Sequence, residues 1–478
     1  MTTRSENPFK LNFWFGTVDP RPFAIFRILL GLTVLHDLVD FTRDLRAFIT
    51  DEGMLPRGAV RDWYAWTAFD LVGGVPAVSA LYLAGVLAVV AFTLGWRTRV
   101  ATVASWLFLI SLHHRNYYVT DGGDDLVRIL FFYAMFADLG AAYGLDAVRN
   151  PSRVTDIPAF VPRLLQLHVA VLYFCASRLK FRRGWLHDNV IFAALQLDGF
   201  ARPPGAWLLG FPRLCRLVTK AVWAMEGLFA FAAFAPFWRQ RTRALAIALG
   251  VAIQGGILLT MRVGVFTEAM LAAMSLWLQP EWIDRAEAWV RGRRSLPADA
   301  RPTRLVVGRP WENVVAILLG VQFVFAVWDL FIGRRFPLPN LVRDERDLIG
   351  IVQPAGLFDV VYDIPRWSAP GVLADGTPVD VLAVVAPGAE PRGPALSFSR
   401  WNKFTFKERE HPFLFPQLGA YLCRGYEERV PGAKLASFTL VDDATPPRGE
   451  DGAPVAPRHR EMWHWTCGTG RVELLADP

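Results

Sequence analysis

Residues 160–180 read FVPRLLQLHVAVLYFCASRLK, a stretch that is long enough and apolar enough to cross a lipid bilayer as one helix. Similar apolar stretches recur through the first two-thirds of the chain. They lie at about 22–40, 76–94, 98–113, 126–143, 160–180, 217–237, 242–261, 264–279 and 312–332. The sequence therefore predicts an α-helical bundle that spans a membrane with roughly eight or nine helices.

The composition agrees with this prediction. Hydrophobic residues make up 53% of the 478 positions and include 18 Trp and 35 Phe, whereas charged residues make up only 20%. A water-soluble surface does not tolerate so apolar a composition over a chain of this length. The charged residues also gather between the apolar stretches, as they do in membrane proteins. These features exclude a soluble enzyme and predict an integral membrane protein in contact with the lipid bilayer.

The charge distribution indicates orientation and partners. The net charge of +7 comes almost entirely from arginine, which is typical of a GC-rich bacterial gene. No dense Lys/Arg run with interleaved aromatic residues is present, so we expect no nucleic-acid partner. Positive residues favour the cytoplasmic side, which predicts a cytoplasmic N-terminus in a bacterial inner membrane. The loops assigned to that side hold Arg97, Arg99, Arg149, Arg153, Arg239, Arg241 and Arg243.

The last part of the chain has a different sequence pattern, in which Pro, Gly and Asp separate short runs of alternating apolar and polar residues. We expect antiparallel strands at GLFDVVYDI (356–364), DVLAVVA (380–386), KLASFTLVDD (434–443) and MWHWTCG (462–468), and a helix at 418–430. The chain thus divides into a membrane domain, 1–335, and a β-rich soluble domain, 336–478. Nine spanning helices would make the second domain extracytoplasmic, where a disulfide between Cys423 and Cys467 is permitted.

Residues 181–205, FRRGWLHDNVIFAALQLDGFARPPG, follow the quoted helix and are too polar at their edges to span a bilayer. We expect a re-entrant or interfacial segment there, and a functional site beside it. Ionisable and amide side chains at membrane depth are the candidates for that site, because such groups are costly in lipid and are usually functional or paired. They are Arg27, Asp124, Gln166, His168, Arg178, Lys180, His187, Glu226 and Gln254.

Several of these residues have structural alternatives. Arg27 with Asp37 or Asp124 would form an ion pair that fixes helix packing. His168 would bond a neighbouring helix or, with His36 or His113, ligate a haem. The spacing of His and Cys residues predicts no metal site.

Lys180 is the most informative candidate, because it ends a predicted spanning helix directly before the polar segment. A lysine at a helix end commonly extends its ammonium to the membrane surface. Alternatively, an amine desolvated in a pocket loses its proton more easily and can act as a base near neutral pH.

Three stretches resemble a known family. YFCASRLKFRRGW (173–185) resembles the segment of vitamin K-dependent gamma-glutamyl carboxylase in which a Tyr-Phe pair precedes, and a Trp follows, the catalytic lysine. VDPRPFAIFRILLGL (18–32) resembles the family's first helix with its arginine, here Arg27. MRVGVFTEAMLAAMSLWLQPEW (261–282) resembles the helix that ends in Pro-Glu-Trp. The chain is most similar to bacterial relatives grouped as the horizontally transferred transmembrane (HTTM) domain superfamily.

The resemblance implies a membrane domain with a β-rich domain, and a lysine base that deprotonates a reduced quinone. Oxygenation of that quinone yields a strong base that abstracts a glutamyl γ-proton before CO₂ adds. Lys180 matches the lysine, and Glu226 matches an acidic residue of the sixth helix. Asp124 and Gln254, however, stand where the family has histidines, which counts against the complete reaction.

Two hypotheses follow. One is a carboxylase-like membrane enzyme in which Lys180 is the general base on a lipophilic, quinol-like substrate, with a protein substrate left open. It requires Lys180 to face a pocket shared with Gln166, His168, Glu226 or Gln254. The other is a non-catalytic membrane scaffold or lipid-binding protein, in which Lys180 faces lipid or water. Neither an inverted repeat nor matched Gly/Pro-broken helices favours a transporter.

Overall fold

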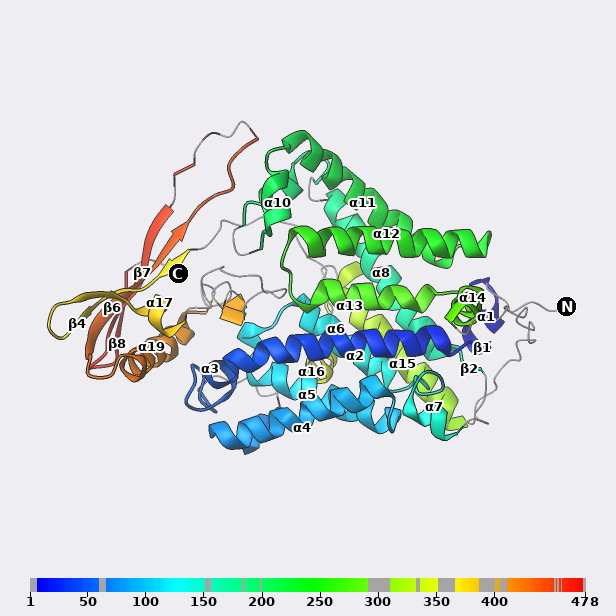
Figure 1. Cartoon of the computed structure of the whole chain (residues 1–478), viewed down its shortest axis with the longest axis horizontal. Coiled ribbons are helices and arrows are strands. Elements are labelled where there is room, and N and C mark those ends of the chain that lie inside the picture. Colours follow the sequence, from blue (N-terminus) through cyan, green and yellow to red (C-terminus); the bar gives the residue numbers. More distant parts are fainter. Residues whose placement is uncertain are drawn as a thin grey trace.

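The computed structural model describes residues 7–59, 66–150, 156–182, 185–197, 200–290, 310–331, 336–350, 366–386, 400–401, 403–404, 411–450, 453, 455–456 and 458–475. Figure 1 shows a bundle of helices with a β-sheet at one end. The N-terminus lies at the opposite end of the bundle from the sheet. The predicted fold class, helical bundle followed by β-rich region, is therefore confirmed in outline.

The bundle contains a helix at each predicted apolar stretch. The longer helices are α2 (Arg21–Phe41), α4 (Val75–Leu94), α5 (Thr98–Arg115), α6 (Gly122–Ala134), α8 (Phe160–Arg182), α11 (Pro212–Phe234), α12 (Arg239–Thr260), α13 (Val265–Met274), α14 (Pro280–Val290), α15 (Pro310–Phe331) and α16 (Asn340–Ile349). Shorter elements are α1 (Leu11–Phe15), β1 (Thr17–Val18), α3 (Leu45–Ile49), α7 (Leu145–Arg149), β2 (Ile157–Pro158), α9 (Val190–Ala194), α10 (Pro203–Leu208) and the 3₁₀ turn η4 (Ser275–Trp277).

Within the described residues, 5 helices are long and apolar enough to cross a membrane: α2, α4, α8, α11 and α12. The predicted count of eight or nine is not confirmed. Two predicted spans are shorter than expected, since α6 ends at Ala134 rather than near 143 and α13 ends at Met274. The chain after α6 is drawn into turns whose carbonyl groups at Leu139 and Tyr143 accept hydrogen bonds from Arg27.

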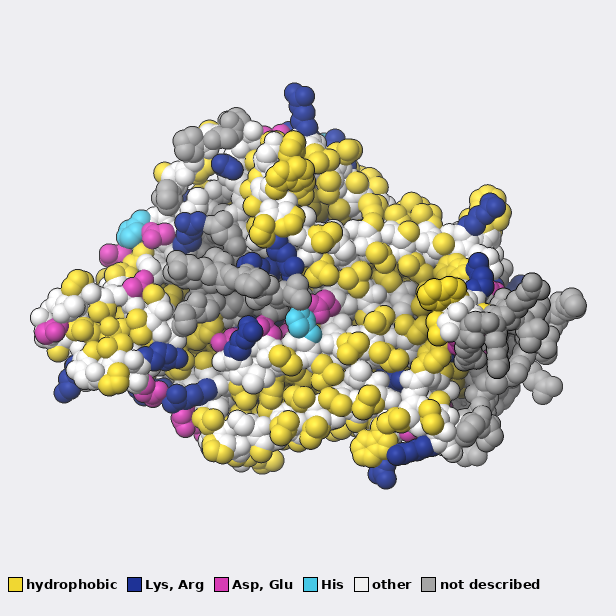
Figure 2. All heavy atoms as spheres, viewed as in Figure 1, with side chains coloured by type: hydrophobic (Ala, Val, Ile, Leu, Met, Phe, Trp, Pro, Cys, Tyr) yellow, Lys and Arg dark blue, Asp and Glu magenta, His cyan; other side chains and the backbone are white. Residues whose placement is uncertain are grey.

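Apolar side chains cover the flank of the bundle. Figure 2 shows hydrophobic side chains over much of this face, with charged groups gathered toward its two ends. On α4, for example, Leu83 and Leu87 are 57% and 58% exposed. Exposed leucines repeated along a helix indicate contact with lipid. The helices and this surface together establish an integral membrane protein.

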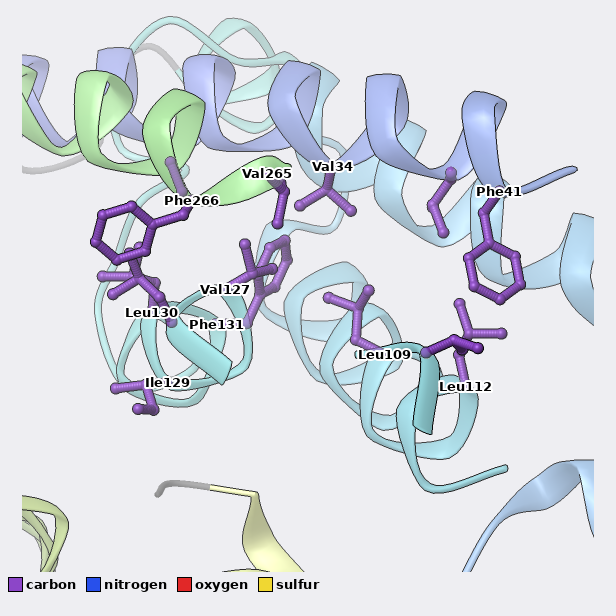
Figure 3. Packing of buried hydrophobic residues seen from close by; sticks show 14 of the residues in the cluster. Val34, Phe41, Leu109, Leu112, Val127, Ile129, Leu130, Phe131, Val265 and Phe266 are labelled. Carbon is purple, nitrogen blue, oxygen red and sulfur yellow. The ribbon is translucent and has the colours of Figure 1, made fainter. Parts of the chain in front are cut away.

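The core of the bundle lies where α2, α5, α6 and α13 meet (Figure 3). Val34 of α2 faces Val265 of α13 and Val127 of α6, and Phe41 of α2 lies near Leu112 of α5. All of these side chains are buried in one continuous hydrophobic cluster. Burial on this scale fixes the helices around which the polar sites are arranged.

The C-terminal sheet is antiparallel, with strand order β5-β4-β6-β7-β8 and β3 paired to β6. Its strands are β3 (Trp367–Ser368), β4 (Pro370–Leu373), β5 (Pro378–Asp380), β6 (Leu435–Ala444), β7 (Arg458–Thr466) and β8 (Arg471–Leu474). Helix α19 (Phe415–Arg429) packs on the sheet, where Trp463 lies 5.4 Å from Phe415 and 5.6 Å from Phe438, measured between ring centroids. A disulfide joins Cys423 to Cys467 across this contact.

Two of the four strand predictions are confirmed, and one is wrong. The stretches 434–443 and 462–468 form β6 and β7, and 418–430 forms α19. The stretch 380–386 is a helix, α17 (Val381–Val385), because the Asp380 carboxylate caps it by accepting hydrogen bonds from the backbone N–H groups of Leu382 and Ala383. The predicted strand at 356–364 lies outside the described residues.

Arg400, from the last third of the chain, is buried between the helices. Its guanidinium donates to both carboxylate oxygens of Asp37 on α2, at 2.8 and 2.6 Å, and to those of Asp124 on α6, at 3.1 and 3.0 Å. The predicted ion pair of Arg27 with Asp37 or Asp124 is therefore wrong, because Arg400 takes both carboxylates.

Lys403 extends the same charged cluster. Its ammonium lies 2.8 Å from Asp121 and 3.4 Å from Asp124. Burial and the neighbouring Arg400 lower the pKa of Lys403, but the carboxylates of Asp121, Asp124 and Asp37 outweigh them and raise it above its ordinary value. Lys403 consequently stays charged, and the cluster ties the C-terminal part of the chain to α2 and α6.

Replacing Arg400 with Met tests this junction. The change leaves two buried carboxylates without their main cation, so we expect the free energy of unfolding to fall by about 3–5 kcal/mol. The measurement is detergent-induced unfolding in mixed micelles. The matched control is Arg43→Met, which removes a 75% exposed arginine bound to Asp40 and should change little. Equal effects of the two variants would contradict the assigned role of Arg400.

Candidate functional site

The candidate site lies between α8 and α11, close to the end of α8. Two reciprocal hydrogen bonds fix the helices there: the Ser177 hydroxyl donates to the Trp223 carbonyl and the Trp223 indole N–H donates to the Ser177 carbonyl, each at 3.1 Å. Lys180 follows Ser177 by almost one helical turn, and Glu226 follows Trp223 by the same spacing. The Lys180 ammonium donates a hydrogen bond to Glu226 Oε1.

This ion pair is buried. Lys180 is 6% exposed and Glu226 is 5% exposed. The ammonium therefore points into the bundle and does not extend to the membrane surface. Because burial of two ions away from water is costly, they persist only as a closely bonded pair.

Trp185 closes the site from the side of the polar segment. The Lys180 ammonium lies 4.8 Å from the centroid of its indole ring, a distance at which the ring face attracts a cation. The Trp185 backbone N–H donates to the Lys180 carbonyl at 3.3 Å, and this contact places the ring. Trp185 is itself buried, so its ring separates the amine from water.

A second buried polar contact joins α8 to α12. The Gln254 amide N–H donates to the Tyr173 hydroxyl at 3.0 Å, and Tyr173 lies within electrostatic reach of Glu226. Among the described residues, Gln254 Oε1 and Glu226 Oε2 have no hydrogen-bond partner. Buried acceptors of this kind usually bind water or a ligand. Two acceptors of the site are thus available to a proton donor.

The other predicted residues lie at different distances from this pair. Arg178 is half-buried on α8, and His187 is exposed in the turn beyond Trp185. His168 is buried between Tyr133 and Phe323, whose ring centroids lie 5.8 and 6.1 Å from its own. It precedes Lys180 by 12 positions, roughly 18 Å along the helix axis. The structure does not bring His168 to Lys180.

Gln166, Arg27 and Asp124 also lie elsewhere. The Gln166 amide donates to the Leu276 carbonyl at 2.6 Å, near the start of α8. Arg27 donates to the backbone carbonyls that follow α6, and Asp124 belongs to the Arg400 cluster. Each of these three polar groups stabilises a helix contact, so only Glu226, and Gln254 through Tyr173, share the Lys180 site.

The histidines proposed as haem ligands bind carboxylates. His36 lies 3.0 Å from Glu268, and His113 lies 3.5 Å from Asp124. The His168 ring packs against Tyr133 and Phe323. The haem alternative therefore has no matched pair of imidazoles among these residues.

Sequence reasoning passed over Tyr173 and Trp185 as site residues. Both flank Lys180 in the motif at 173–185, so their spacing carried the signal. Trp223 gave no such signal, because it is one of many aromatic residues on apolar helices. Its part in holding α8 against α11 depends on tertiary packing.

The pair can store and move a proton. In a dry interior, transfer of the proton from the Lys180 ammonium to the Glu226 carboxylate converts two ions into a neutral amine and a neutral acid. A neutral amine beside Trp185 is a competent proton acceptor. Transfer of a proton within the pair therefore leaves no isolated charge in the bundle.

A double-mutant cycle tests whether Lys180 and Glu226 form this pair. Lys180→Met alone and Glu226→Gln alone should each lower the free energy of unfolding by about 3 kcal/mol, because each leaves a partner buried alone. The double variant should be more stable than the sum of the two losses predicts. Unfolding in mixed micelles is the measurement. Strict additivity of the two losses would contradict the pair.

A family model of the HTTM domain matches residues 15–282, which is more than half of the 478-residue chain. The match includes Lys180, Glu226 and Gln254 and ends within α14. No curated protein and no solved structure matches the chain. The predicted membership of the HTTM superfamily is confirmed over residues 15–282, and the chain belongs to the HTTM domain family.

Proposed function

We propose that this protein is a membrane enzyme in which Lys180 removes a proton from a lipid-soluble, quinol-like substrate. The observation that carries the proposal is the buried pair of Lys180 and Glu226, closed by Trp185. The HTTM domain and the apolar helices indicate a membrane protein related to the carboxylase family, which supports the choice of substrate class. A reduced quinone is the implied co-substrate.

The proposed step begins from the neutral form of the pair, with the proton on Glu226. The Lys180 amine accepts a phenolic proton and becomes an ammonium ion. The substrate keeps the electron pair as a phenolate, which the new ammonium neutralises. Glu226 holds the first proton throughout, so the pair and the bound anion together carry no net charge.

The aromatic side chains near the pair suit an aromatic ring with a lipid tail. Tyr173 packs on Phe229 with ring centroids 4.3 Å apart, and Phe229 contacts Trp277 at 5.2 Å. On the outer side, Phe181 is 61% exposed and stacks on Trp223. Aromatic walls bind flat apolar rings, and an exposed aromatic edge on a lipid-facing helix favours entry from the bilayer.

The later steps of a carboxylase are not part of this proposal. Gln254 and Asp124 stand where the family has histidines, and Asp124 is bound by Arg400 and Lys403. An amide has no basic nitrogen, and a carboxylate already bound by two cations is a weak base, so neither residue replaces an imidazole base there. We therefore restrict the proposed activity to deprotonation of the quinol and the reaction of the resulting anion with oxygen, and leave CO₂ addition and a protein substrate outside it.

We further propose that the N-terminus is cytoplasmic and the β-rich domain is extracytoplasmic, in a bacterial inner membrane. The two lie at opposite ends of the bundle (Figure 1), and the disulfide between Cys423 and Cys467 is typical of an oxidising compartment. The positive-inside rule supplies the direction.

Cysteine labelling tests this orientation. Ala374→Cys places a thiol in the exposed turn between β4 and β5, and Lys10→Cys places one near the N-terminus, where Lys10 is exposed. In intact spheroplasts a membrane-impermeant maleimide should label position 374 at once and position 10 only after lysis. The reverse pattern would overturn the proposed orientation.

Oxygen-dependent consumption of a panel of reduced quinones by the purified protein tests the activity. Lys180→Ala should lose at least about a hundredfold in rate, because a positioned base contributes that much or more. Lys220→Ala is the matched control, since Lys220 is an exposed lysine on α11 and should keep the wild-type rate.

Two negative results of this assay would contradict the proposal in different ways. No turnover of any quinol by folded wild-type protein would sink the enzyme hypothesis and favour the non-catalytic scaffold or lipid-binding alternative. Equal rates for Lys180→Ala and wild type would remove Lys180 from the reaction.

A further inference from the structure

The β-rich domain contacts the polar segment that follows α8. The contact comes from residues 445–450, which follow β6 directly and which we call the strap. Figure 1 shows the chain beyond β6 and β7 extending from the sheet toward α10. The strap contacts residues 185–196, which include Trp185 and α9 and which we call the cover. The β-rich domain is therefore joined to the segment that closes the Lys180 site.

Gln196 of the cover bonds the strap backbone in both directions. Its amide N–H donates to the Arg448 carbonyl at 3.1 Å, and its Oε1 accepts a hydrogen bond from the Arg448 backbone N–H at 2.9 Å. A side-chain amide paired in this way acts like a neighbouring strand, because it satisfies both backbone groups of one residue. Pro446 and Pro447 restrict the backbone that presents these groups. The contact therefore reports the position of the strap.

Glu450 makes the second contact of the strap. Its Oε1 accepts a hydrogen bond from the Asn189 amide at 3.1 Å and another from the Arg216 guanidinium on α11 at 2.6 Å. The same Asn189 amide donates to the Pro212 carbonyl at the start of α11, at 2.8 Å. Asn189 thus links the cover, the strap and α11 at one point, four positions after Trp185.

The strap contacts lie at the surface, whereas α9 has a buried inner face. The side chains of Arg216 and Glu450 are 52% and 31% exposed, and exposed ion pairs of this kind break and re-form easily. Phe192 and Leu195 of the cover, by contrast, belong to a buried apolar cluster. The turn that carries Trp185 precedes α9. It can therefore move when the strap is released while α9 stays packed on the bundle.

Access of water determines the protonation form of the Lys180–Glu226 pair. In water near neutral pH an amine keeps its proton and a carboxylic acid loses its own, so a hydrated pair consists of two ions. In a dry interior the neutral amine and the neutral acid become favourable, because burial penalises both charges. The Trp185 ring lies over the amine at 4.8 Å. Its position therefore bears directly on the form that the pair adopts.

We propose that docking of the strap holds the cover closed over Lys180, so that the β-rich domain controls the access of water to this buried amine. With the strap docked, Trp185 keeps the pair dry. With the strap released, the turn that carries Trp185 moves outward and water reaches the amine. The further consequence, that release of the strap fixes Lys180 as an ammonium ion and switches off the base, rests on the proposed function.

Acylation of the native lysines by water-soluble sulfo-N-hydroxysuccinimide acetate, followed by peptide mass spectrometry, tests the proposal on the full chain in detergent micelles. The rate at Lys180 relative to Lys220, an exposed lysine on α11, reports access to the buried amine. In the wild type this ratio should be far below one. Gln196→Ala and Glu450→Ala should each raise it about tenfold, because each variant removes two hydrogen bonds that hold the cover.

Two matched controls accompany the strap variants. Gln240→Ala removes an exposed glutamine on α12, and Asp188→Ala removes an exposed carboxylate of the cover that forms no hydrogen bond to the strap among the described residues. Both should keep the wild-type ratio. If one strap variant fails to fold, the other decides the question.

Three results would overturn the proposal: a wild-type Lys180 modified as fast as Lys220, a ratio that the strap variants leave unchanged, or an equal rise in the controls. Quinol turnover does not enter this measurement. The proposed function can therefore fail while control by the strap is upheld, and control by the strap can fail while the proposed function is upheld.

Discussion

A charged side chain inside a lipid bilayer must find its partners within the protein, because no water is present to solvate it. The buried charges of this chain follow that constraint. Arg27 binds the carbonyl groups after α6, and Arg400 binds two carboxylates on separate helices. Lys180 binds Glu226. Each contact joins segments that apolar packing alone would leave free to slide, and so the polar contacts set the register of the bundle.

The same constraint gives the Lys180 site its chemical character. A lone buried lysine would lose its proton, and a lone buried glutamate would gain one, whereas the pair can exist in either form. The aromatic residues around it exclude water without supplying a competing charge. A site of this kind can accept one proton from an apolar substrate and still remain close to electrical neutrality, which suits a reaction inside the membrane.

Sequence reasoning recovered the parts of the fold that depend on local patterns. Apolar length predicted the helices, and alternation predicted β6 and β7, because each signal is contained in a few neighbouring residues. The local apolar pattern wrongly predicted a strand at 380–386, because it takes no account of the Asp380 carboxylate that caps a helix there. It also overestimated α6, whose end depends on Arg27 from another helix.

The site residues likewise divide into those that local sequence identifies and those whose partners are distant in the chain. Lys180 and Glu226 were recognisable because each is an ionisable residue at membrane depth, and their motif spacing matched a family. Asp124 looked equally functional by that criterion, yet its partner is Arg400, 276 positions later in the chain. No local pattern predicts a contact at that separation. Gln166 and Arg27 are further examples of polar residues whose tertiary partners are backbone carbonyl groups.

Anaerobic ultraviolet absorption of a reduced quinone bound to the protein is the most direct measurement of the central claim, that the Lys180 pair accepts a substrate proton. Without oxygen, proton transfer is the only step available. The absorption of the quinolate anion should appear on binding to the wild-type protein and be absent with Lys180→Met at the same occupancy. A bound quinol that stays fully protonated in the wild type, or a quinolate that persists in Lys180→Met, would contradict the account.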